Sequence, residues 1–201
     1  IHIEEDAGKL VHERGDTFVD YNRGGVPLIE IVTEPDIRSV DEAIEYVEKL
    51  QLIMKTIGVS DCKMQEGSLR CDVNVSVKPV DSDEFGTRAE IKNMNSFTFM
   101  RQAMEYEFER QVDLIESGEE VIQETRRFNT STGMTESMRS KEDAHDYRYF
   151  REPDLVTIYT SDEEIEGLRG TLPELPDSKV KRYVSDFEIS ETDAKIIAKY
   201  R

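Results

Sequence analysis

The chain has 201 residues, of which 44 are acidic and 26 are basic, and its formal net charge at pH 7 is −18. Such a charge repels a phosphate backbone at long range, so it argues against a general DNA or RNA binder without a local basic site or a helping chain. No stretch approaches the ~20 consecutive apolar residues of a membrane helix, and two cysteines are too few for a disulfide scaffold, so we expect a soluble cytoplasmic protein.

The ends of the chain suggest a piece of something longer. The sequence opens in a strand-like Ile1-His2-Ile3, has no initiator methionine, and stops within a helical pattern at Arg201. We therefore expect a fragment of a longer protein.

The first third of the chain combines short extended segments with one helix. Residues 1–5, 17–21 and 27–33 are strand-like and are separated by glycines, which is typical of β structure with tight turns. Ser39 and Glu42 form a capping-box pattern, which predicts a helix that ends near Gly58.

The clearest strand pattern lies in the middle of the chain. Residues 69–78 alternate apolar and polar side chains with a period of two, and residues 87–92 repeat this alternation. The turn-forming residues between them predict a hairpin. If the two strands pair, one face of the sheet carries Arg70, Asp72, Asn74, Arg88, Glu90 and Lys92.

The remaining elements complete an α+β pattern. A long helix is predicted from Ser96 to near Gly118, and two strand-like runs, 123–128 and 135–139, form a second hairpin. Residues 155–159 suggest a last strand, and the pattern after Ser161 is helical. We expect a domain boundary near residue 160.

The polar face of the predicted sheet is the first candidate site. Two neighbouring strands each combine carboxylates with Arg or Lys, and Mg²⁺ needs carboxylate oxygens while transferring phosphates need basic groups. This combination suggests a metal–nucleotide site. Cross-strand salt bridges or an ordinary solvated face produce the same pattern and remain alternatives.

Two further carboxylates lie among apolar residues. By strand alternation Glu5 falls on the face of Ile1 and Ile3, and Glu30 lies between two isoleucines. A carboxylate buried there needs a cation, a metal or hydrogen bonds. The three histidines, in contrast, show no metal-ligand spacing and are expected at the surface or as satisfied core residues.

Six segments of this sequence resemble the B subunit of the bacterial tRNA-dependent amidotransferase, the GatB family, in the order that the family has them. They are residues 4–9, 20–32, 66–76, 90–97, 123–126 and 146–150. No Walker loop, dinucleotide fingerprint or nucleophile elbow competes with this interpretation.

The resemblance implies an α+β fold, with an antiparallel sheet and flanking helices in a glutamine-synthetase-like cradle. Residues 1–160 would belong to this cradle, and residues 161–201 would begin a helical domain. It implies ATP-dependent phosphorylation of the side-chain carboxylate of Glu-tRNA(Gln) or Asp-tRNA(Asn), followed by amidation with ammonia. The expected cofactors are ATP and Mg²⁺.

The resemblance also assigns roles to residues. Glu5, Asp72 and Glu90 resemble the magnesium carboxylates of the family. Arg70 and Lys92 are expected to contact phosphate, and Arg88 and Asn74, on the same predicted face, are expected to bind the nucleotide.

The expected partners are the A and C subunits of the amidotransferase and a misacylated tRNA(Gln) or tRNA(Asn), with no membrane or DNA partner. The A subunit is the glutaminase that supplies ammonia, and the small C subunit braces the pair. Full-length family members have a leading segment and a tail domain that this chain lacks, so we expect the isolated chain to be inactive. The alternative is a non-catalytic module that docks the glutaminase and the tRNA.

Overall fold

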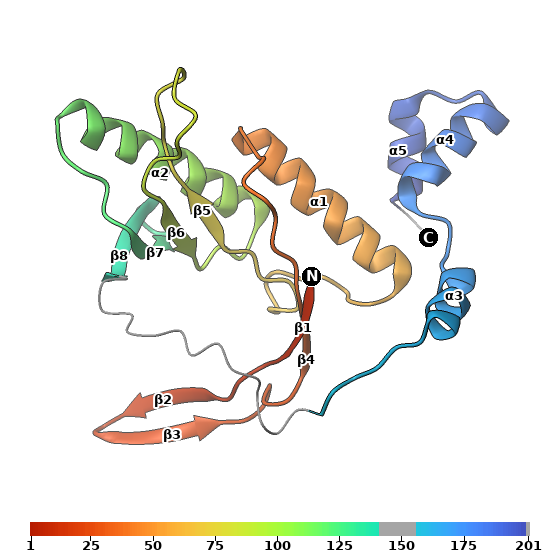
Figure 1. Cartoon of the computed structure of the whole chain (residues 1–201), viewed down its shortest axis with the longest axis horizontal. Helices are drawn as coiled ribbons and strands as arrows, with labels where there is room; N and C mark the ends of the chain where they lie inside the picture. Colours follow the sequence, from red (N-terminus) through yellow and green to blue (C-terminus); the bar gives the residue numbers. More distant parts are fainter. Residues whose placement is uncertain (141–155, 200–201) are drawn as a thin grey trace. The chain divides into compact units, whose positions relative to one another are not determined.

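The computed structural model describes residues 1–140 and 156–199, and these form two compact units (Figure 1). The first unit comprises Ile1–Arg38 and the second comprises Ser39–Arg201. Both predicted hairpins and the predicted helices are present. The expected α+β class is therefore confirmed, whereas the specific cradle fold stays a prediction.

The first unit consists of two antiparallel strand pairs. Strand β1 (His2–Glu5) pairs with β4 (Pro27–Glu30), and β2 (Lys9–Glu13) pairs with β3 (Asp16–Asp20). The sequence analysis predicted three of these strands and missed β2. None of residues 1–38 is buried, so the two strand pairs are held together by backbone hydrogen bonds and by the turns that connect the strands.

Helix α1 (Val40–Ile57) opens the second unit and agrees with its prediction at both ends. Ser39 caps the helix, and the capping box with Glu42 is present in both directions. Gly58 follows with φ of 76°, the left-handed conformation that a residue without Cβ adopts at little cost. Local sequence therefore determines where this helix starts and stops.

A four-stranded sheet in the order β5-β6-β7-β8 forms the centre of the second unit. The strands are β5 (Val73–Val75), β6 (Ala89–Lys92), β7 (Glu124–Asn129) and β8 (Met134–Ser140). The predicted strand over 69–78 is thus reduced to three residues, and the strand over 87–92 to four. Both predicted hairpins are antiparallel, as expected.

The expectation of a wholly antiparallel sheet is wrong at one pair of strands. Strands β6 and β7 are parallel, with Glu90 opposite Thr125 and Lys92 opposite Arg127. Helix α2 (Phe97–Glu116) lies between them in the chain, and a crossover helix of this kind brings the next strand back in the same direction. The sheet is therefore mixed.

Helices α1 and α2 and the sheet enclose one apolar core. Its buried members come from α1, β6, α2, β7 and the segment after β6: Ala43, Ile44, Val47, Ile91, Met94, Met100, Ala103, Met104 and Phe128. The two faces of β6 therefore differ, because Ala89 and Ile91 are fully buried while Glu90 between them is on the opposite, polar face.

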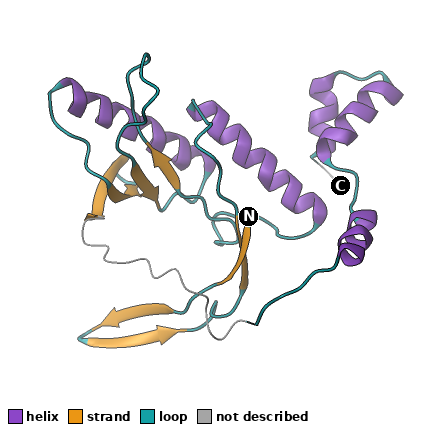
Figure 2. Cartoon of the chain, viewed as in Figure 1, coloured by secondary structure: helices purple, strands orange, loops and turns teal. Residues whose placement is uncertain are grey.

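Three helices end the chain, as Figure 2 shows. They are α3 (Asp162–Thr171), α4 (Pro176–Phe187) and α5 (Glu191–Ala198), and α4 packs against α5. The predicted strand over 155–159 is wrong for residues 156–159, which have no regular structure, and Leu155 lies outside the described residues. The predicted loop over 146–150 lies outside them as well.

The proposed boundary near residue 160 stays a prediction, since the contact division falls at residue 38. No helix in the described part of the chain combines the length and apolar character that crossing a bilayer requires.

Candidate functional site

The polar face of the β5–β6 hairpin brings together four of the residues predicted from sequence. Asn74 lies opposite Glu90 in the strand register, and Asp72 and Lys92 lie at the next position along the same face. The apolar residues that alternate with them face the core. The predicted sharing of one face is thus confirmed for Asp72, Asn74, Glu90 and Lys92.

Lys92 lies between two carboxylates. Its Nζ donates a hydrogen bond to Oδ2 of Asp72 at 2.7 Å and is 3.3 Å from Oε1 of Glu90. The side chains of Lys92 and Asp72 are 40% and 47% exposed, whereas Glu90 is only 19% exposed. A ligand approaching from solvent would therefore meet Lys92 and Asp72 before Glu90.

A neighbouring strand orients the Glu90 carboxylate. Thr125 lies opposite Glu90 on the parallel strand β7, and its Oγ1 donates to Oε2 of Glu90 at 2.9 Å. Since Lys92 approaches the other oxygen, both oxygens of Glu90 have a protein partner. Thr125 was not among the predicted site residues, because its contact depends on the parallel pairing of β6 and β7.

The two carboxylates also affect the protonation of Lys92. Burial by itself would lower the pKa of this ammonium, but the hydrogen bond and charge of Asp72 and the charge of Glu90 together raise the pKa above its usual value. The lysine is therefore positively charged at neutral pH. It supplies a fixed cation on a face that would otherwise carry two negative charges.

The salt-bridge alternative of the sequence analysis is present in this cluster. The Lys92–Asp72 and Lys92–Glu90 pairs are cross-strand and same-face ion pairs of the expected kind. They are compatible with a ligand site, because an exposed ion pair costs little to rearrange. The ligand roles of these residues accordingly stay predictions.

Of the other predicted residues, Arg70 and Arg88 are each two residues from a member of this group, Asp72 and Glu90 respectively, whereas Glu5 belongs to the other unit. Arg70 precedes β5, Arg88 immediately precedes β6, and both are exposed. Glu5 belongs to β1 of the first unit, so its grouping with Asp72 and Glu90 stays a prediction. Glu5 and Glu30 are both exposed, so burial does not demand a cation at either position.

A buried carboxylate that the sequence analysis missed lies on α2. Glu107 is completely buried, and its Oε1 accepts hydrogen bonds from Arg110 at 2.6 Å and Gln111 at 2.9 Å. Its Oε2 accepts from Thr135 at 2.9 Å and is 3.3 Å from Nε of Arg126. We call Glu107 and these four partners the Glu107 cluster.

The Glu107 cluster lies on the core face of α2. The apolar residues Phe108 and Ile115 of this helix lie off that face and are 53% and 47% exposed. The buried positions are Met100, Ala103, Met104, Glu107 and Gln111, which follow the same helical spacing of three or four residues. This spacing was the available signal, although it required placing a glutamate and a glutamine in the core.

Comparison with known proteins assigns most of this chain to one group. Residues 1–166 match the family described as the GatB/GatE catalytic domain. The chain is 56% identical over 198 residues to the B subunit of the aspartyl/glutamyl-tRNA(Asn/Gln) amidotransferase of Thermodesulfovibrio yellowstonii. The protein of the same name from Thermoanaerobacter sp. is 58% identical over 198 residues, and that from Clostridium kluyveri is 57% identical over 197.

These alignments cover unequal shares of the two proteins. Each includes 98% of this chain but only 41–42% of the relative. The chain therefore spans about two fifths of the length of the curated relatives that it matches.

Proposed function

Because the chain belongs to the GatB/GatE catalytic domain family, we propose that it provides the ATP-dependent step of a tRNA-dependent amidotransferase. In this step the side-chain carboxylate of Glu-tRNA(Gln) or Asp-tRNA(Asn) attacks the γ-phosphate of ATP, which releases ADP and forms an acyl phosphate. Ammonia then displaces phosphate and leaves the amide. The substrate supplies the nucleophile, so no nucleophilic side chain is needed.

The observation that supports this proposal best is the Lys92 cluster, the group formed by Asp72, Glu90 and Lys92. Phosphoryl transfer depends on positioned positive charge and on carboxylates that hold a metal. This sheet face has both within hydrogen-bonding distance. It is also accessible from solvent, which distinguishes it from the buried Glu107 cluster.

The residues of this face fit a magnesium ion. Carboxylate oxygens are the ligands that Mg²⁺ prefers, and Asp72 and Glu90 already direct oxygens toward one cationic group. We propose that these two and Glu5 hold the metal. Bound Mg²⁺ would supply charge neutralisation on the ATP phosphates.

The protein groups around that ion would position the nucleotide. Lys92 would exchange Asp72 for a phosphate oxygen, Arg70 would contact phosphate, and Arg88 and Asn74 would contact the remainder of the nucleotide. Thr125 would keep the Glu90 carboxylate oriented, because its hydroxyl holds one oxygen from the neighbouring strand. The glutaminase, or A, subunit would supply ammonia, with the C subunit and the misacylated tRNA completing the assembly.

The family match over residues 1–166 and the change in the sequence pattern after Ser161 support a domain assignment as well. We propose that residues 1–160 belong to the catalytic cradle domain and that residues 161–201 begin a helical domain. We further propose that this chain alone does not form the amide, since it spans about two fifths of the relatives. Glutaminyl-tRNA formation by the isolated chain with ammonium and ATP would contradict that.

Calorimetric titration with ATP and Mg²⁺ tests the nucleotide site. We expect heat of binding for the unmodified chain and at least about a tenfold loss of affinity in Asp72→Asn and Lys92→Met, since each removes a charge-assisted contact. The chain offers a matched control, because Lys63 also lies between two carboxylates, at 2.9 Å from Glu66 and 3.5 Å from Asp61. Lys63→Met and Asp61→Asn should bind ATP normally.

A docking role without catalysis is the second candidate. The β2–β3 hairpin exposes Leu10, Phe18 and Val19, with Leu10 directly opposite Val19 in the register. Exposed apolar side chains of this kind suit contact with another macromolecule. Absence of ATP binding in the unmodified chain, together with binding to the glutaminase that Leu10→Ser abolishes, would favour this role over the first.

A further inference from the structure

The Lys92 cluster lies at the end of the strand pairing that brings it together. The last register pair of the β5–β6 hairpin at this end is Val73 with Ile91, so Asp72 and Lys92 lie one residue beyond it. Their 2.7 Å ion pair is therefore not fixed by the antiparallel pairing itself. Another contact has to hold the end of β6 if Lys92 is to keep its place.

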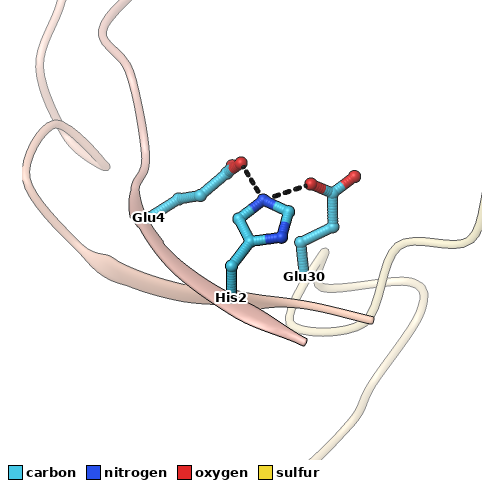
Figure 3. Close-up of side chains that lie close together, drawn as sticks. All are labelled: His2, Glu4 and Glu30. Atoms are coloured by element: carbon cyan, nitrogen blue, oxygen red, sulfur yellow. Dashed lines mark hydrogen bonds and ion pairs between the residues drawn. The ribbon is translucent and has the colours of Figure 1, made fainter. Parts of the chain in front are cut away.

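A comparable group in the first unit shows the difference. The imidazole of His2 lies between the carboxylates of Glu4 and Glu30, and its Nε2 is 2.6 Å and 2.7 Å from one oxygen of each (Figure 3). There His2 and Glu30 are directly opposite in the register of β1 with β4. Strand pairing thus places that group by itself, whereas the Lys92–Asp72 pair needs a further restraint.

Asn93, the residue after Lys92, supplies such a restraint. Its Nδ2 donates a hydrogen bond to the backbone oxygen of Phe128 at 3.2 Å. Phe128 lies on β7, one residue beyond Arg127, which is the register partner of Lys92. The side chain of Phe128 is 1% exposed and belongs to the close-packed core. The amide of Asn93 therefore joins the end of β6 to a well-fixed part of the unit.

The backbone of Asn93 has an uncommon conformation. Its φ of 69° lies in the left-handed region, where residues other than glycine are rare and asparagine is several-fold enriched. Within residues 1–140 and 156–199, the other non-glycine residues with positive φ are Arg14, Cys62 and Glu188. Such conformations persist where the surrounding structure enforces them, and they concentrate at functional sites. Asn93 is also exposed, so its side chain is not needed to fill the core.

We propose that Asn93 is a positioning residue of the nucleotide site. The left-handed backbone turns the chain directly after Lys92, and the hydrogen bond to Phe128 keeps this turn in place. The Lys92 side chain thereby starts from a fixed backbone and reaches Asp72 and Glu90 together. The role rests on the proposed nucleotide function of Lys92, although the placement of Lys92 can be measured without ATP.

A fixed Lys92 favours anion binding for an entropic reason. A lysine side chain has many rotamers, and ordering such a side chain at the moment of binding lowers affinity by about fivefold. In the unmodified chain this order is present before a phosphate arrives. Loss of the Asn93 contact should therefore weaken ATP binding through Lys92, without removing any charge from the site.

Calorimetric titration of the 201-residue chain with ATP and Mg²⁺ tests this coupling. Asn93→Gly keeps the left-handed backbone and removes the hydrogen bond, so we expect about a fivefold loss of affinity. In the Lys92→Met background the same change should have less than about a twofold effect, because the residue on which it acts is gone. An equal loss in both backgrounds, or no loss in either, would overturn the proposal.

The matched control is Glu188→Gly, the same kind of substitution at another position of positive φ. Glu188 follows α4 and has a φ of 54°. This variant should bind ATP normally. A loss equal to that in Asn93→Gly would mean that the effect is not specific to the end of β6, and would contradict the proposed role.

NMR spectra without ATP separate this proposal from the proposed function. In the unmodified chain the two Hε protons of Lys92 should have distinct resonances, because a fixed side chain gives them different surroundings, and these should merge in Asn93→Gly. The methyl resonances of the buried Met100 and Met104 should stay unchanged, which a general loss of structure would not allow. Distinct Hε resonances in Asn93→Gly would overturn the role of Asn93, whereas absence of ATP binding by the unmodified chain would overturn the proposed function alone.

Discussion

The sheet of the second unit carries two clusters of opposite charges that differ in their access to water. In the Glu107 cluster the carboxylate is completely buried and both oxygens have protein donors. In the Lys92 cluster the side chains of Lys92 and Asp72 are 40% and 47% exposed. Carboxylates beside basic side chains therefore have different uses: the closed cluster stabilises the fold, whereas the open one can exchange a partner for a ligand.

The physical reason lies in desolvation. A buried carboxylate that loses its partners keeps an uncompensated charge in an apolar surrounding, so its contacts cannot be exchanged cheaply. An exposed pair regains water when it opens, and its net contribution to stability is small. Substitutions in the Glu107 cluster should therefore mainly lower stability, whereas substitutions in the Lys92 cluster should mainly weaken ligand binding. Three predictions test this difference.

The largest effect is expected at Glu107. Glu107→Gln removes the negative charge between Arg110 and Arg126, and it should lower the free energy of unfolding by about 3 kcal/mol, the lower end for breaking a buried ion pair. Urea denaturation followed by circular dichroism measures the change. Glu109→Gln on the exposed side of α2 is the control and should change stability by less than about 0.5 kcal/mol. A loss below about 1 kcal/mol at Glu107 would remove the distinction between the clusters.

The second-largest effect is expected on the stability of the chain at acid pH, through Glu107. Burial alone would raise the pKa of Glu107, but hydrogen bonds from Arg110, Gln111 and Thr135 lower the pKa below 4.5. A lowered folded-state pKa means that the contribution is complete above the unfolded value and is lost as pH falls through the folded value. Stability should therefore decline below pH 4.5, and the decline should be shallower in Glu107→Gln. Parallel acid profiles for the two proteins would contradict this.

The smallest effect is expected at Lys92. Lys92→Met should change the free energy of unfolding by less than about 1 kcal/mol, as for other exposed ion pairs, while it weakens ATP binding. The raised pKa of Lys92 means that its contribution is complete below pH 10.5 and is lost as pH rises through the folded value. Thermal melts of Lys92→Met and Lys63→Met should therefore be similar at pH 7. A large loss in Lys92→Met alone would make Lys92 a structural residue.

The elements with strong local signals were predictable from the sequence. Helix α1 has its capping box and its left-handed glycine where the pattern placed them, and α2 begins after its predicted cap at Ser96. The β5–β6 hairpin has the expected antiparallel pairing. These features depend on residues that are close in the chain, so the sequence contains the information directly.

The composition of the candidate site was only partly predictable. Alternation placed Asp72, Glu90 and Lys92 on one face, and the ion pairs between them confirm that placement. Thr125 joins Glu90 only because β6 and β7 run parallel. The burial of Glu107 likewise depends on Arg126 of β7 and Thr135 of β8, which the helical pattern alone does not bring to it.

The sequence by itself determined the order of helices and hairpins, the polar face of β5–β6 and the resemblance of six segments to one family. The tertiary structure alone decided the parallel pairing of β6 with β7, the burial of a carboxylate in the core, and the meeting of His2 with Glu30. The reason is that periodicity and capping act over a few residues. Strand register and the compensation of buried charge depend instead on residues that are distant in the chain.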